Sequence, residues 1–95
     1  MSDEFLDFKE LNFLTYGAPP APGAYFNDFL KRKNITPNKA AKEMSLAQST
    51  VQRFINGGSL SVNMAKAIQK TYKIDCGVLF KIDARYKTFL VSEME

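Results

Sequence analysis

The sequence of 95 residues contains no histidine. This absence removes the commonest general base, the commonest metal ligand and every catalytic triad that depends on an imidazole. The remaining side chains form no catalytic constellation, so we predict a protein that is not an enzyme and has no metal, cofactor or small-molecule ligand. Binding to a macromolecule is the kind of function that the composition favours.

Cysteine and long apolar runs are also scarce. Cys76 is the single cysteine, so the chain cannot form an internal disulfide. The N-terminus shows no basic stretch followed by a continuous apolar one, and no apolar run approaches the length that spans a membrane. These absences predict a cytoplasmic protein without a membrane segment.

Acidic residues are almost missing from the middle of the chain, although the whole protein has a net charge of only +3. Residues 31–73 contain nine lysine and arginine residues against Glu43 alone, a net charge of +8. Residues 1–20 contain four acidic residues against Lys9, a net charge of −3. This separation predicts two surfaces with different partners, the basic one suited to nucleic acid, although charge alone equally fits an ordinary solvated face.

The remaining composition is typical of one small folded domain. Apolar residues make up 45% of the chain, enough for a single modest core. Residues 17–23, GAPPAPG, are predicted to be a linker because their prolines prevent a continuous helix. We therefore expect an acidic and apolar N-terminal arm or extra helix at 1–16, the linker at 17–23 and a folded domain at 22–92.

Apolar residues at helical spacing predict that this domain is all-α, with five short helices and no strand. Three of the helices follow a residue suited to capping, namely Thr36, Ser61 and Asp75. The predicted helices begin at Pro22, at Pro37, at Ala47, after Ser61 and after Asp75, and Asn56-Gly57-Gly58 ends the third.

The second and third predicted helices, Pro37–Glu43 and Ala47–Ile55, have the lengths and the short connection of a helix-turn-helix. In this motif the second helix lies in the DNA major groove, and its N-terminal residues meet the base edges. The apolar interior that such a unit needs is supplied by Ala40, Ala41, Met44, Leu46, Val51 and Phe54.

The 47–55 helix has a polar outer face with no evident partner in the neighbouring sequence. Glutamine pairs with adenine through two hydrogen bonds, and arginine suits guanine or phosphate. We predict that this face contacts DNA bases through Gln48, Ser49, Gln52 and Arg53. The alternative is an ordinary solvated helix face.

Residues around this helix are predicted to contact DNA phosphates. Lys39 and Lys42 lie on the helix that crosses the DNA backbone, and Asn56 and Gly57 offer backbone N–H groups at the end of the next helix. The alternatives are a simple helix stop and a capping role for Ser61. The predicted phosphate contacts are Lys39, Lys42, Asn56, Gly57, Ser59 and Asn63.

Residues from about 19 to 90 resemble the HigA antitoxin family, within the lambda-repressor-like or XRE-type helix-turn-helix proteins. The resemblance rests on APPAPGAYFNDFL, STVQRFINGG, VNMA and DARY. It implies a five-helix DNA-binding domain, repression of the protein's own operon as a dimer, and neutralisation of a ribonuclease toxin of the RelE-like fold. Ser45 and Ala47 depart from the family pattern, which has a glycine in the turn and a capping hydroxyl residue before the recognition helix.

Two apolar segments exceed the needs of the core. The end of the last predicted helix suggests a two-fold dimer seam formed by Tyr86, Phe89, Leu90 and Val91. The N-terminal segment is interpreted as an extra helix on the domain's own surface, as an arm that folds onto a basic toxin, or as a dimer contact. Its candidate toxin-binding residues are Phe5, Leu6, Phe8, Leu11 and Phe13.

The helix-turn-helix pattern and the family resemblance together favour an antitoxin that binds an inverted-repeat operator and, as the resemblance implies, a RelE-like toxin. A stand-alone phage-type repressor and a toxin-binding module without DNA binding are the alternatives.

Overall fold

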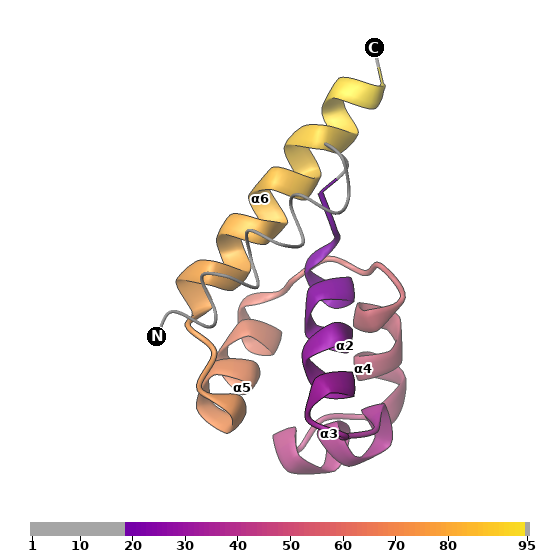
Figure 1. Ribbon diagram of the computed structural model, residues 1–95, viewed down its shortest axis with the longest axis vertical. Coiled ribbons are helices and arrows are strands. Elements are labelled where there is room, and N and C mark those ends of the chain that lie inside the picture. The colour runs from indigo at the N-terminus through magenta and orange to yellow at the C-terminus, as the bar shows by residue number, and fades with distance from the viewer. Residues whose placement is uncertain (1–18, 95) are drawn as a thin grey trace.

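The computed structural model describes residues 19–94, which form five α-helices and no strand, as the sequence predicts. The helices are α2 (Pro22–Arg32), α3 (Pro37–Met44), α4 (Gln48–Ile55), α5 (Val62–Tyr72) and α6 (Cys76–Glu93). Figure 1 shows α2 alongside α4, α3 at one end of that pair, and α6 running diagonally until its last turns lie beyond the other helices. Within the described residues no helix is both long and apolar enough to cross a membrane.

Side-chain caps fix two of the helix starts. The Thr36 hydroxyl accepts a hydrogen bond from the Lys39 backbone N–H at 3.1 Å, and the Ser61 hydroxyl accepts one from Met64 at 3.0 Å. Both caps satisfy N–H groups that have no partner inside their helix, and both confirm the predicted starts. Ala47 precedes α4 in an extended conformation and supplies no side-chain cap.

The predicted cap of α6 is wrong. Asp75 occupies the position before α6, but its carboxylate makes no capping hydrogen bond. The Gln69 side-chain oxygen instead accepts a hydrogen bond from the Cys76 backbone N–H at 2.8 Å. The short connection between α5 and α6 brings the last turn of α5 close to the first N–H of α6. Sequence motifs for helix capping include only residues next to the helix start, so they do not predict this hydrogen bond.

Positive φ angles occur after four of the described helices, at Asn34, Ser45, Gly57 and Lys73. Gly57 has φ +107°, which confirms the predicted glycine stop after α4. Ser45, between α3 and α4, has φ +58° and ψ +42°, a conformation that costs a non-glycine residue roughly 1 kcal/mol. The backbone of Ser45 is therefore strained in a turn where a glycine would not be.

Phe26 of α2 lies at the centre of the core and is fully buried. Its ring centroid lies 6.1 Å from that of Phe54 in α4 and 5.8 Å from that of Tyr72 in α5. The interior predicted for the helix-turn-helix is confirmed, because five of its six residues are buried and Leu46 packs partly buried against them. The buried five are Ala40, Ala41, Met44, Val51 and Phe54.

The backbones of α2 and α4 touch at Gly23. A Cβ atom on Gly23 would lie only 1.8 Å from the carbonyl oxygen of Phe54, a distance that no packed structure allows. Glycine at this position therefore permits the close approach that sets the position of α4 relative to the core.

Candidate nucleic-acid interface

The helix α4 divides into a buried face and an exposed one. Val51 and Phe54 are buried against the core, whereas the four predicted base-contacting side chains are exposed. The exposed four are Gln48, Ser49, Gln52 and Arg53. This arrangement leaves the side chains at the start of α4 directed to solvent, as required of a helix that enters the major groove.

Gln48 has a partner that the sequence did not reveal. Its side-chain amide nitrogen donates a hydrogen bond to the side-chain oxygen of Asn38, near the start of α3. A glutamine amide has two hydrogens and one acceptor oxygen, so one hydrogen and the oxygen remain available. These are the groups that a two-pronged contact with adenine uses, and Asn38 orients the amide that carries them.

The exposed lysines of α3 extend this surface. Lys39 and Lys42 are both exposed, and neither ammonium group has an ion-pair partner within residues 19–94. Asn38 of the same helix bonds to Gln48 of α4, and two exposed cations on such a helix suit the phosphates that flank a major groove.

Glu43, the single acidic residue between positions 31 and 73, is hydrogen-bonded to a neighbouring helix, α5. Its carboxylate oxygen Oε1 accepts a hydrogen bond from the Tyr72 hydroxyl at 2.6 Å. Burial, followed by the hydrogen bond and the negative charge of Glu43, raises the pKa of Tyr72 far above its ordinary value. The tyrosine therefore stays protonated and remains a donor. No sequence motif pointed to this contact between residues 29 positions apart.

The loop after α4 requires one correction. The backbone N–H groups of Asn56 and Gly57 donate to Gln52 and Phe54 at 3.0 and 3.1 Å, so they end the helix and are not free for a phosphate. Asn56 keeps an exposed side-chain amide, whereas Gly57 has no further donor. Ser59 and Asn63 are exposed on the same loop and at the start of α5.

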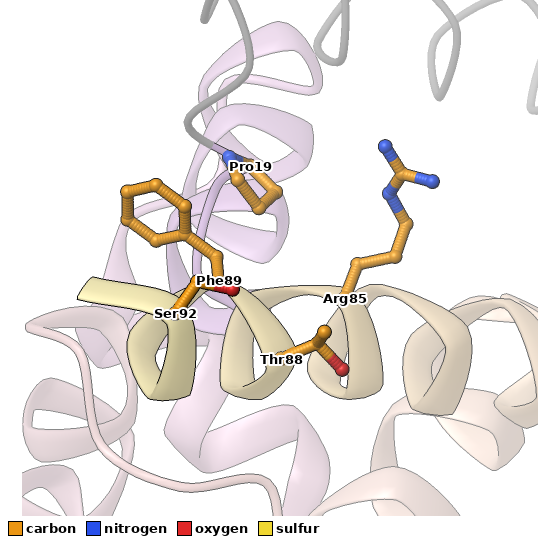
Figure 2. A pocket seen from close by; sticks show the side chains of 5 residues that line it. All are labelled: Pro19, Arg85, Thr88, Phe89 and Ser92. Atoms are coloured by element: carbon orange, nitrogen blue, oxygen red, sulfur yellow. The ribbon is translucent and has the colours of Figure 1, made fainter. Parts of the chain in front are cut away.

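The predicted dimer residues do not share one face of α6. Residues two apart on an α-helix point about 160° away from each other, which separates Phe89 from Val91. Leu90 and Val91 are 41% and 60% exposed, and Tyr86 and Phe89 are partly buried. Phe89 lines an open groove of about 340 Å³ with Pro19, Arg85, Thr88 and Ser92, which Figure 2 shows on one side of α6.

The candidate toxin-binding residues, Phe5 to Phe13, lie outside the residues that the structure describes. Their role stays a prediction. The groove on α6 is lined in part by Pro19, the first described residue.

The family model described as "Helix-turn-helix" matches residues 28–79, which is more than half of the chain. The chain belongs to this helix-turn-helix family. The matched residues contain all of α3, α4 and α5, so the family assignment covers the whole candidate interface. It also confirms the lambda-repressor-like, XRE-type fold that the resemblance implied. No curated protein matches the chain in sequence.

Three solved structures share the fold of this family member. A candidate antidote protein of a plasmid maintenance system from Nostoc punctiforme has a TM-score of 0.75 at 21% identity, covering 80% of this chain and 85% of that one. An addiction module antidote protein of the HigA family from Coxiella burnetii has a TM-score of 0.74 at 18% identity, with the same coverage. A hypothetical protein from Escherichia coli has a TM-score of 0.71 at 20% identity, covering 78% of each chain.

Proposed function

We propose that this chain is a DNA-binding antitoxin that represses its own operon as a dimer. The observation that carries the proposal is the exposed polar face at the start of α4, together with the exposed Lys39 and Lys42 of α3, which have no ion-pair partner within residues 19–94. Gln48, Ser49, Gln52 and Arg53 are assigned to base edges, and Lys39, Lys42 and the side chains of Asn56, Ser59 and Asn63 to phosphates.

The antitoxin part of the proposal draws on the fold and the charge distribution. Two structures of the same fold are described as antidote proteins of a plasmid maintenance system and of an addiction module. The N-terminal segment, with its net charge of −3 and its large apolar residues, suits a basic partner. We assign Phe5, Leu6, Phe8, Leu11 and Phe13 to a RelE-like ribonuclease toxin.

DNA binding is tested with two variants that separate base reading from phosphate binding. Gln48→Ala should weaken binding to the operator by about 1–3 kcal/mol and change binding to random DNA little, because a base contact is lost. Lys39→Ala should weaken binding to both duplexes alike. It should also lower the slope of log affinity against log salt concentration by about one. Fluorescence anisotropy at several salt concentrations measures both effects.

Lys81→Ala is the matched control, because Lys81 is an exposed lysine of α6, outside the proposed interface. Its removal should leave both affinities close to those of the wild-type protein. Identical behaviour of Gln48→Ala and Lys39→Ala would contradict the division into base readers and phosphate contacts. A footprint without an inverted repeat would contradict the proposed dimeric operator, whose half-sites should lie about 34 Å, or a multiple of it, apart.

The proposed dimer uses the exposed apolar residues at the end of α6. Leu90 and Val91 form its centre, and Met94, 84% exposed, extends the same end of the helix. Leu90→Glu with Val91→Glu should convert the protein to a monomer and weaken operator binding, because two half-sites are no longer held together. Analytical ultracentrifugation measures the mass. A wild-type protein that is already monomeric at micromolar concentration would contradict the seam.

A stand-alone repressor of the same fold is the second candidate, because the polar face of α4 and the family match serve it equally well. The neighbouring gene distinguishes the two. A short reading frame that encodes a basic RelE-like protein favours the antitoxin, and the absence of any toxin gene favours the stand-alone repressor. A third candidate, a toxin-binding module without DNA binding, predicts no salt-dependent affinity for any duplex.

A further inference from the structure

Glu43 and Lys39 lie four positions apart on the exposed side of α3. Opposite charges at this spacing are neighbours on a helix surface and commonly form an ion pair. Within residues 19–94 these two do not form one. The Glu43 carboxylate is instead hydrogen-bonded to the Tyr72 hydroxyl of α5 at 2.6 Å. A contact between helices thus replaces the local ion pair that the sequence would allow.

The Tyr72 ring is fixed by its neighbours. Its centroid lies 5.8 Å from the ring of Phe26 and 5.6 Å from the ring of Phe29, which it meets edge to face. Both phenylalanines belong to α2, and Phe26 is fully buried. Because the core holds the ring, the hydroxyl has a defined position, where it donates its hydrogen bond to the exposed Glu43 side chain.

We propose that Tyr72 is a positioning residue for DNA binding, which holds the Glu43 carboxylate against α5 and leaves Lys39 unpaired for a phosphate. This inference rests on the proposed DNA binding. A released carboxylate would reach the Lys39 ammonium one helical turn away and neutralise it. It would also add a negative charge to a surface that is otherwise basic and repel the phosphates.

The expected size follows from the cost of one phosphate contact. Each contact contributes about 0.9 to the slope of log affinity against log salt concentration, which corresponds to about eight-fold in affinity at 0.1 M salt. Tyr72→Phe keeps the ring and removes only the hydroxyl. We expect it to weaken binding to operator and random DNA alike, by about three- to eight-fold at 0.1 M salt, and to lower the slope by up to about 0.9.

The double variant separates positioning from a general structural role. Glu43→Gln removes the charge, so its affinity should equal or exceed that of the wild-type protein. Tyr72→Phe introduced into Glu43→Gln should then have no further effect, because no carboxylate remains to be released. An equal loss from Tyr72→Phe in both backgrounds, or no loss in either, would overturn the inference.

A second pair of variants leaves Tyr72 untouched. Glu43→Asp keeps the charge but shortens the side chain by one methylene, so its carboxylate no longer reaches the hydroxyl. It should weaken DNA binding as Tyr72→Phe does, whereas Glu43→Gln should not. Equal affinities of the two Glu43 variants would refute the positioning role even if Tyr72→Phe failed to fold. If the wild-type protein shows no salt-dependent binding to any duplex, the proposed DNA binding itself fails.

Discussion

At the scale of single residues, the position of the recognition helix depends on a missing side chain. Gly23 lies in the first turn of α2, and any Cβ there would collide with the backbone of α4 at Phe54 and Ile55. Backbone atoms at a helix end cannot move aside as a flexible side chain can. The contact therefore acts on α4 as a whole, together with the four exposed side chains proposed to read DNA.

Gly23→Ala should lower the free energy of unfolding by about 3 kcal/mol or more, because α2 and α4 must separate to make room for the methyl group. This loss exceeds the gain from alanine's better helix propensity. Thermal and urea unfolding measure the loss. Ala24→Ser is the control, since Ala24 is the exposed neighbour in the same turn, and it should change stability by less than about 0.5 kcal/mol. A Gly23→Ala protein as stable as the control would show that α2 and α4 accommodate a methyl group between them.

At the scale of the helices, α4 starts less favourably than its neighbours. Thr36 caps α3 and Ser61 caps α5, whereas Ala47 gives α4 no side-chain acceptor and Ser45 holds a left-handed turn before it. The recognition helix therefore depends mainly on the burial of Val51 and Phe54 for its stability. Its local sequence is not optimal for the structure that it adopts.

Ala47→Ser should raise the free energy of unfolding by about 1 kcal/mol, because the extended backbone of Ala47, with ψ 142°, suits a capping residue. In a domain of this size the gain corresponds to roughly 4–8 °C in Tm. Thr36→Ala is the matched opposite and should lower the free energy of unfolding by a similar amount. An unchanged Tm in the Ala47→Ser protein, beside a clear loss in Thr36→Ala, would mean that α4 gains nothing from a cap.

At the scale of the whole molecule, the charges separate into an acidic N-terminus and a basic helix-turn-helix. The −3 of residues 1–20 precedes α2 in the sequence, and the +8 of residues 31–73 begins in its last turn. Opposite charges on two segments allow two partners of opposite charge to bind the same chain. We therefore expect toxin neutralisation and DNA binding to be separable.

Deletion of residues 1–16 should leave operator affinity unchanged or slightly higher, because a segment with the same sign as the phosphates is removed. Toxin neutralisation should fall, and Tm should change little. Replacing the four acidic residues of the segment by their amides is the control that separates charge from apolar contact. A large drop in Tm with toxin inhibition retained would identify the segment as part of the domain's own packing.

The sequence by itself determined the five helices, most of their ends and the face of α4 that meets solvent. These features depend on residues within a few positions of one another, as the Thr36 and Ser61 caps and the burial of Val51 and Phe54 illustrate. The family resemblance pointed to the same fold, which the match over residues 28–79 confirms.

The tertiary structure alone decided which side chains meet between helices. Asn38 with Gln48 and Tyr72 with Glu43 join two helices through side chains. The Gln69 side chain accepts a hydrogen bond from the Cys76 backbone, and Gly23 meets Phe54 through backbone atoms. The rotation of α6 about its axis places Phe89 in a groove and leaves Val91 exposed. Such contacts depend on how helices cross and rotate about their axes, and the packing of the whole core fixes both, whereas sequence periodicity reports only which side of each helix is buried.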